Sequence, residues 1–253
     1  MEVGLFSKLR QHRILMPNLL TKGTEVSRLI NVVTGIRGPI SYYLEIGVEY
    51  GKTLEAVRAN KKIGVDPKFL FHSGFQTSNL SLYKMTSDEY FSLENSEKID
   101  IAFIDGWHSA TQAYTDFINL LSRVNEKSII IIDDTIPSDI HSTLSTPEEA
   151  YLSRNNAGVP NDFKWHGDVY RCIYSIIANF PSLNYATIAD MKNPVTIFYG
   201  FSGESSSIKS KKQTTPNNYE SFLSSLNIAI PNEFNPKVKE EFYYDLKNYY
   251  ANI

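Results

Sequence analysis

The chain has 253 residues, of which 42% are apolar and 21% are charged, and its formal net charge is -3. This size and composition fit one α/β domain with appended segments, and the absence of a basic block argues against nucleic acid as a partner. No apolar run approaches the roughly 20 residues that cross a bilayer, so we expect no membrane insertion. Residues 1–13 lack the apolar centre of a secretory signal, and the single cysteine, Cys172, excludes an internal disulfide, so we expect a cytoplasmic location.

The first half of the chain alternates between apolar strands and amphipathic helices. Helices are expected at residues 5–13 and 24–34, before the first strand. The elements expected after them, in chain order, are a strand at 42–46, a helix at 52–60, strands at 61–65, 80–85 and 99–104, a helix at 110–123 and a strand at 129–132. Such alternation predicts a doubly wound, mostly parallel α/β sheet of the Rossmann-like kind.

The alternation stops after Asp134. Residues 135–165 are rich in Ser, Thr and Pro, with a short helix expected at 147–153, and we interpret this long connection as a substrate loop or lid. A helix is then expected at 167–179, followed by an antiparallel edge hairpin of residues 185–189 and 195–199. The expected organisation is an N-terminal helical segment at 1–40, a main domain at 41–201, a linker at 202–218 and a C-terminal helical tail at 219–253.

The tail carries a helix signal, with Asn235 as the cap and Pro236 at the first helical position. Its apolar stripe contains Val238, Phe242, Leu246 and Tyr249. This helix must dock on its own domain, on a second copy of the chain or on another partner. A homo-oligomer formed through the terminal helices is one of these outcomes.

A glycine turn, residues 45–51, connects the first strand of the sheet to its helix. Backbone amides and the helix dipole at such a turn favour an anionic or polar ligand. A dinucleotide fingerprint needs a glycine where Glu49 stands, so NAD fits poorly. Asp66, at the end of the next strand, is placed to accept both hydroxyls of a ribose, which points to a nucleoside without a diphosphate. The alternative is that the glycines only permit tight packing and that Asp66 caps a turn before Pro67.

Three carboxylates end two buried strands. Asp105 follows the apolar run at 99–104, and Asp133 and Asp134 follow four isoleucines. Because ligands of open α/β sheets bind beyond the carboxyl ends of the strands, these acids can share one divalent cation. Oxygen ligands suit Mg²⁺ or Mn²⁺, and buried acids repel one another unless a cation or proton intervenes. The alternative is a set of solvated carboxylates that cap the next elements.

These motifs resemble, in their order along residues 42–200, the class I S-adenosylmethionine-dependent methyltransferases. Glu45-x-Gly47-x-x-x-Gly51 resembles their first motif, Asp66 their ribose-binding acid, and Thr86-Ser87-Asp88 the turn beside the adenine. The sequence Phe103-Ile104-Asp105-Gly106-Trp107-His108, followed by Ile131-Ile132-Asp133-Asp134, is similar to the metal-dependent small-molecule O-methyltransferases. Trp165-His166-Gly167-Asp168-Val169-Tyr170 resembles bacterial members that modify sugars and surface polysaccharides.

The resemblance implies two cofactors, S-adenosylmethionine and Mg²⁺ or Mn²⁺, and a hydroxylated small-molecule acceptor, a sugar or nucleotide-linked sugar. The cofactor-binding residues that it implies are Glu45, Gly47, Gly51, Thr53, Asp66, Ser87, Asp88 and Asp105. The implied metal ligands are Asp105, Asp133 and Asp134, the implied catalytic residues are His108 and Asp105, and the implied substrate-binding residues are His108, Trp165, His166 and Asp168.

Several alternatives stay open at this point. His108 can take a proton from a metal-held hydroxyl, act as a fourth metal ligand, or support Asp105. Trp107 and Trp165 can belong to the core, and Asp168 can act only on the helix dipole. For the whole chain, the alternatives are a metal-dependent oxygenase or hydrolase that uses the Asp/His cluster, and a catalytically silent methyltransferase-like module that binds a ligand or partner.

Overall fold

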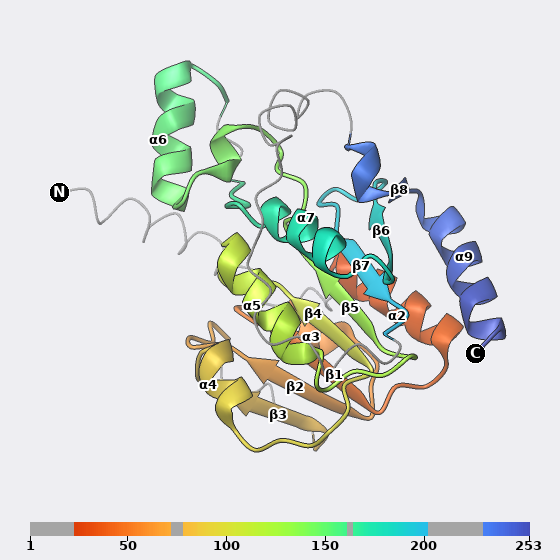
Figure 1. The fold of residues 1–253 in the computed structure, drawn as a ribbon. Helices are drawn as coiled ribbons and strands as arrows, with labels where there is room; N and C mark the ends of the chain where they lie inside the picture. Colours follow the sequence, from red (N-terminus) through yellow and green to blue (C-terminus); the bar gives the residue numbers. More distant parts are fainter. Residues whose placement is uncertain (1–22, 72–77, 161–163, 202–229) are drawn as a thin grey trace.

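The computed structural model describes residues 23–71, 78–160, 164–201 and 230–253 (Figure 1). The helix expected at 5–13, the linker expected at 202–218 and the first part of the tail lie outside these ranges. Within them, eight strands form one sheet in the order β3-β2-β1-β4-β5-β7-β6-β8. The strands are β1 Tyr42–Ile46, β2 Lys61–Val65, β3 Leu80–Tyr83, β4 Ile101–Ile104, β5 Ile129–Ile132, β6 Asn184–Ile188, β7 Thr196–Tyr199 and β8 Pro236–Lys237.

The sheet is parallel from β3 to β5, and β7 pairs antiparallel with both β5 and β6. The chain builds outward from β1 first toward β3 and then, from β4, toward the other edge, so the winding reverses between β1 and β4. Ligands of doubly wound sheets bind beyond the strand ends at such a reversal. The predicted mostly parallel α/β sheet with an antiparallel hairpin is confirmed.

Helices cover both faces of the sheet (Figure 1). On one face the buried cluster joins β strands to α4, α5 and α7, and on the other it joins them to α2, α3 and α9. The helix α6 stands away from both layers (Figure 1). The helices are α2 Glu25–Arg37, α3 Lys52–Ala56, α4 Ser87–Ser92, α5 Ala110–Leu120, α6 Pro147–Ala157, α7 Tyr170–Asn179 and α9 Lys239–Ala251, with short 3-10 helices η1 His141–Thr143 and η3 Asn232–Phe234.

Local sequence signals explain where most helices begin. Thr24 and Ser109 cap α2 and α5 by accepting hydrogen bonds from backbone amides two to three residues into each helix. The α4 helix has a complete capping box between Thr86 and Glu89. Helix α6 starts with Thr146 as cap and proline at the first helical position, and it extends four residues beyond the end expected from the sequence.

The predicted start of the C-terminal helix is wrong. Asn235 adopts a left-handed conformation with φ 47°, its carbonyl accepts a hydrogen bond from Thr187 N, and Nδ2 donates to Tyr185 O. The following two residues pair with β6 as strand β8, so the helix begins only at Lys239. The carbonyl oxygens of Asn235 and Lys237 accept hydrogen bonds from the amides of Thr187 and Ala189, along the edge strand β6. A helix that began at Asn235 would leave these amides without those partners, so the sheet contact overrides the local helix signal.

The tail helix packs on its own domain. Phe242 and Leu246 of α9 are fully buried in the cluster that contains α2, as the apolar stripe predicted, whereas Val238 is 48% exposed. Tyr249 Oη donates a hydrogen bond to Glu126 O at 2.9 Å. The described part of the tail is therefore an integral layer of the domain.

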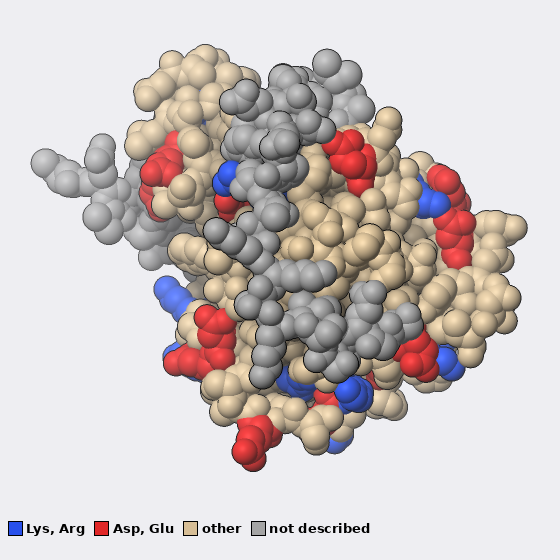
Figure 2. All heavy atoms as spheres, in the orientation of Figure 1, with Lys and Arg blue, Asp and Glu red and all other residues tan. Residues whose placement is uncertain are grey.

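The described helices include none that is long and apolar enough to cross a membrane. On the face drawn in Figure 2, the described Lys and Arg side chains are interspersed with Asp and Glu rather than gathered in one patch. This distribution agrees with the near-neutral charge of the sequence.

Candidate functional site

The residues directly after β1, β4 and β5 are fixed at one edge of the sheet by backbone hydrogen bonds. These N···O contacts join Gly47 to Val65 at 2.9 Å, Asp105 to Ile46 at 2.8 Å and Asp133 to Ile104 at 3.0 Å. The parallel ladder therefore continues one residue beyond each strand. It places the glycine turn and the strand-end acids side by side, as the sequence predicted.

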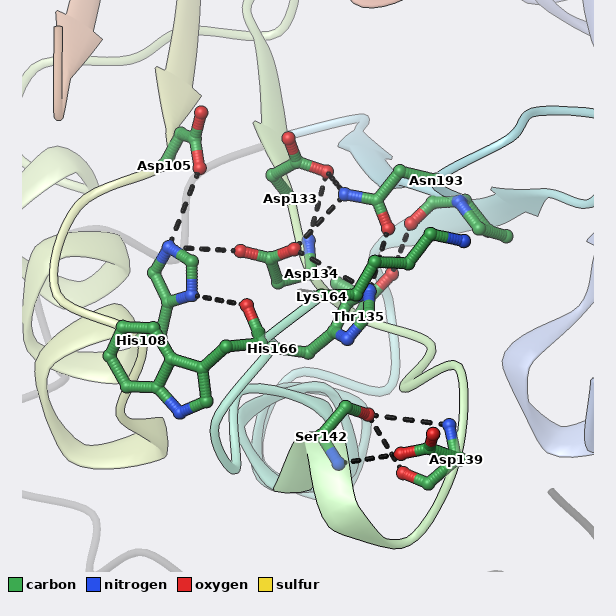
Figure 3. A network of polar contacts seen from close by, with 12 residues as sticks. Asp105, His108, Asp133, Asp134, Thr135, Asp139, Ser142, Lys164, His166 and Asn193 are labelled. Carbon is green, nitrogen blue, oxygen red and sulfur yellow. Dashed lines mark hydrogen bonds and ion pairs between the residues drawn. The ribbon is translucent and has the colours of Figure 1, made fainter. Parts of the chain in front are cut away.

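The acids at this edge meet one histidine (Figure 3). Nε2 of His108 lies 3.1 Å from Oδ2 of Asp134 and 4.0 Å from Oδ1 of Asp105. One ligand atom from each of these three residues lies within 4.8 Å of the others, a spacing that one metal ion can bridge. Asp134 holds the left-handed φ of 57°, and such strain in a residue other than glycine is typical of functional sites.

Burial and proximity change the protonation of the cluster. Burial raises the pKa of Asp134 to about 7, and burial together with the Asp134 charge raises the pKa of Asp133 to about 8. Partial burial and the charges of Asp133 and Asp134 raise the pKa of Asp105 well above its ordinary value. Burial lowers the pKa of His108. A bound cation would reverse these shifts in the carboxyl groups, so this oxygen-rich donor set fits a hard divalent cation.

Asn193, in the turn between β6 and β7, connects the acids to a second histidine. Its Nδ2 donates to Oδ1 of Asp133 at 2.8 Å and to Oδ1 of Asp134 at 3.0 Å. Its Oδ1 lies 3.2 Å from Nε2 of His166, a buried residue. Nothing in the sequence selects Asn193, because an Asn before Pro194 is typical of an ordinary turn. His166, expected to bind substrate, lies in this network.

Residues 165–167, which lead into α7, lie directly on His108. Trp165 O is 3.0 Å from Nδ1 of His108, and the Trp165 ring stacks on the imidazole with a centroid distance of 4.5 Å. Gly167 has φ 58°, and a Cβ there would lie 1.8 Å from His108 O. Trp107 is 69% exposed and meets the Trp165 ring edge-on at 6.3 Å. Trp165 is thus part of the site rather than of a remote core.

The described parts of the insertion, residues 135–160 and 164–165, are held by specific contacts, although the sequence predicted a largely irregular loop. Arg154 of α6 is buried and donates to both carboxylate oxygens of Asp139, at 2.9 and 3.0 Å, and to Lys164 O at 2.9 Å. Nε1 of Trp165 donates to Leu144 O at 2.7 Å. These contacts fix the chain that leads back to His108.

The glycine turn contacts the end of β4 at Asp105. Gly47 has φ 85°, and a Cβ at this position would lie 1.9 Å from Asp105 O. Oδ2 of Asp66 accepts hydrogen bonds from Val48 N at 2.8 Å and Glu49 N at 2.9 Å. Asp66 therefore holds the glycine turn in place. Its Oδ1 also accepts a hydrogen bond from Lys68 N at 2.7 Å, which matches the alternative in which Asp66 caps the turn at Pro67.

The other residues that the sequence associated with the cofactor are tied to neighbouring elements. Glu45 is buried and accepts a hydrogen bond from Tyr43 Oη at 2.6 Å, and burial raises its pKa to about 8. The Thr53 hydroxyl lies 2.8 Å from that of Thr24. The remaining pair, Ser87 and Asp88, accepts from Nε2 of Gln112 at 3.1 and 3.2 Å.

Asp168 stabilises the start of α5. Its Oδ1 accepts from Ala110 N at 2.7 Å, and its Oδ2 accepts from Arg171 at 3.2 Å. Together with Ser109, it supports the first turn of α5, which follows His108 in the chain. Asp168 thus acts at the start of α5, whereas the alternative considered from the sequence was the dipole of its own helix, α7.

Comparison with known proteins follows this geometry. Residues 44–135, which run from β1 to the strand-end acids after β5, match the family model described as "Methyltransferase domain". This segment is therefore similar to methyltransferase domains. A search among curated proteins finds no significant match.

Solved structures share the fold of this chain. The O-methyltransferase from Bacillus cereus in complex with SAH is 13% identical, with 76% of this chain and 88% of that chain covered and a TM-score of 0.52. Cofactor-bound Rv0187 from MTB is 13% identical, with 80% and 92% covered and a TM-score of 0.51. The Rossmann-like fold expected from the sequence is confirmed, and these two solved structures share it.

Proposed function

We propose that this chain is a methyltransferase that uses S-adenosylmethionine to methylate a hydroxyl group. The hydroxyl would be activated at a divalent cation held by Asp105, Asp133 and Asp134. The observation that carries the proposal is the contact between the glycine turn and the strand-end acids. Gly47 approaches Asp105 O so closely that no side chain fits between them. A methyl donor on the turn and a cation on the acids would therefore lie beside one another.

The proposed cofactor site lies along the glycine turn, from Gly47 to Gly51. Asp66 can still accept a hydrogen bond from one ribose hydroxyl, because its Oδ1 accepts only from Lys68 N and has a second lone pair. Ser87 and Asp88, held by α5 through Gln112, are proposed to lie beside the adenine, while Glu45 and Thr53 support the turn from the sheet and from α2. S-adenosylmethionine supplies a methyl group on a sulfonium, so the carbon–sulfur electron pair leaves with sulfur when the acceptor oxygen bonds to that carbon.

The proposed cation is Mg²⁺ or Mn²⁺, since the acids offer only oxygen atoms. When bound, such a cation lowers the pKa of a hydroxyl that it coordinates. The carboxyl groups hold protons because they are buried beside one another, and they release these protons as they take up a cation.

His108 is proposed to accept the hydroxyl proton. Its Nδ1 lies 3.0 Å from a carbonyl oxygen, which can only accept, so Nδ1 carries the ring proton and Nε2 faces the acids with a lone pair. Burial lowers its pKa, which keeps the ring neutral and able to take a proton near pH 7. A role as metal ligand is less favoured, because hard cations prefer oxygen.

The acceptor is proposed to be a sugar or a nucleotide-linked sugar, as in bacterial polysaccharide modification. Trp107 exposes most of its ring next to Trp165, and an aromatic face beside polar groups suits the apolar face of a sugar ring. His166 and Asp168, on the same segment as Trp165, are proposed to line the acceptor side.

Mn²⁺ titration of chelator-treated protein, combined with a methyl-transfer screen over glycosides and nucleotide sugars, tests this proposal. We expect Asp133→Ala to lose metal-dependent turnover while S-adenosylmethionine still binds. His108→Gln should keep Mn²⁺ affinity and lose turnover, whereas loss of Mn²⁺ affinity would make His108 a ligand. Glu148→Gln removes an exposed carboxylate of α6 and is the matched control. Undiminished turnover in Asp133→Ala would contradict the metal assignment.

A further inference from the structure

We infer that Asn193 is a positioning residue that aligns the carboxylates of Asp133 and Asp134 for the cation. This inference rests on the proposed function. Asn193 lies outside the segment that the methyltransferase family model matches, and it reaches the strand-end acids from the turn between β6 and β7. It contributes no atom to the Asp105, His108 and Asp134 group itself.

The orientation of the Asn193 amide follows from its neighbours. With a cation bound, both carboxylates would be ionised and would only accept hydrogen bonds, so the Nδ2 end faces Asp133 and Asp134, at 2.8 and 3.0 Å. The Oδ1 end then faces Nε2 of His166 at 3.2 Å, and that nitrogen must carry a proton. One amide thus supplies a donor to each acid and an acceptor to the histidine, a combination that neither an acid nor a lysine can supply.

The hydrogen bonds select one oxygen of each acid. Both contacts from Asn193 fall on Oδ1, and Asp134 N also donates to Oδ1 of Asp133, at 2.9 Å. Oδ2 of Asp134 instead faces Nε2 of His108 at 3.1 Å, toward Asp105 (Figure 3). Holding one oxygen of a carboxylate turns the other toward the cation, as partners of metal ligands commonly do.

A buried row of threonine hydroxyls fixes the turn that carries Asn193. Thr135 donates to Pro194 O at 3.2 Å, the Thr196 hydroxyl lies 3.0 Å from that of Thr135, and the Thr187 hydroxyl lies 2.8 Å from that of Thr196. All three threonines are fully buried. The residue after the acids is therefore joined to the residue after Asn193, so the amide cannot move independently of the acids.

The test compares Mn²⁺ binding in chelator-treated protein by calorimetry and by the electron paramagnetic resonance spectrum of the bound ion. Asn193→Leu keeps the volume and removes every hydrogen bond, and Asn193→Ser keeps a single donor. Lys192→Ala changes an exposed side chain of the same turn and is the control. We expect Asn193→Leu to weaken Mn²⁺ binding by about 10- to 100-fold and to change the spectrum, with a smaller loss in Asn193→Ser, while S-adenosylmethionine affinity is retained.

Two results would overturn the inference. Wild-type Mn²⁺ affinity and spectrum in Asn193→Leu, even with reduced stability, would leave Asn193 with a structural role only. If Asn193→Leu fails to fold, wild-type affinity and spectrum in Asn193→Ser would have the same meaning. Absence of Mn²⁺ binding in the wild-type chain is a different outcome, because it removes the metal site of the proposed function together with this inference.

Discussion

Replacing Gly47 with alanine perturbs the contact on which the site depends. The added Cβ would lie 1.9 Å from Asp105 O, about 1.5 Å closer than ordinary van der Waals contact, and both partners are backbone. The φ of 85° costs about 1–2 kcal/mol for a residue with a Cβ. Forcing apart two packed segments costs about 1–3 kcal/mol more. We therefore expect Gly47→Ala to lose about 2–5 kcal/mol of unfolding free energy.

The same shift should impair binding, because it separates the glycine turn from the acid cluster. Displacement of a site by about 1 Å can reduce activity by about 100-fold. We expect Gly47→Ala to weaken both S-adenosylmethionine and Mn²⁺ binding, measured by calorimetry, with stability measured by urea denaturation.

Two other glycines separate the effects of strain and overlap. Gly158 has φ 65° and no atom within 4 Å of an added Cβ, so Gly158→Ala should cost about 1–2 kcal/mol and leave binding unchanged. Gly35 lies inside α2 with open space around an added Cβ, so Gly35→Ala should stabilise the chain by about 0.5–1 kcal/mol. If Gly47→Ala matches Gly158→Ala in stability and binds both ligands normally, the close contact at Asp105 is refuted.

Three further predictions concern the insertion, the acids and the exposed tryptophan. Arg154→Leu removes the two hydrogen bonds that the half-buried Asp139 carboxylate accepts from a buried guanidinium, so it should cost about 1.5–3 kcal/mol and reduce hydrogen-exchange protection across α6, and unchanged protection would contradict this role. Because the pKa values of Asp133 and Asp134 are raised to about 8 and about 7, the folded chain holds protons that the unfolded chain releases near pH 4; the unfolding free energy of metal-free protein should therefore fall from pH 5 to pH 8. The lowered pKa of His108 makes the unfolding free energy rise with pH. Only one group contributes to this rise, whereas two contribute to the fall. Added Mn²⁺ should reduce this slope in urea denaturation, and a metal-free profile that rises with pH would contradict the assignment. Trp107→Ala should change stability by less than about 0.5 kcal/mol because the ring is exposed, yet raise KM for a sugar acceptor, and an unchanged KM would remove this ring from the acceptor site.

Buried strands were the part of the fold that the sequence predicted best. The four isoleucines of β5 and the apolar run of β4 have no polar residue that could face solvent, so only a covered parallel sheet accommodates them. The acids after these strands follow from the same pattern, because parallel strands end at one edge.

Contacts between distant segments were not predictable in this way. The tail helix starts late because Asn235 is recruited to the edge of β6, more than 40 residues earlier in the chain. Asn193 reaches acids about 60 residues away, and Arg154 orders an insertion that reads locally as a polar loop. In each case a side chain or backbone group contacts a partner that is distant in the sequence. Local hydrophobic periodicity does not predict such a contact.

Isothermal titration of chelator-treated protein with S-adenosylmethionine, without and with Mn²⁺, tests the central claim most directly. We expect saturable binding of one S-adenosylmethionine per chain. We also expect binding of one Mn²⁺ per chain, and Asp133→Ala should abolish this Mn²⁺ binding. Failure of S-adenosylmethionine to bind under either condition would contradict the assignment of the glycine turn as the methyl-donor site.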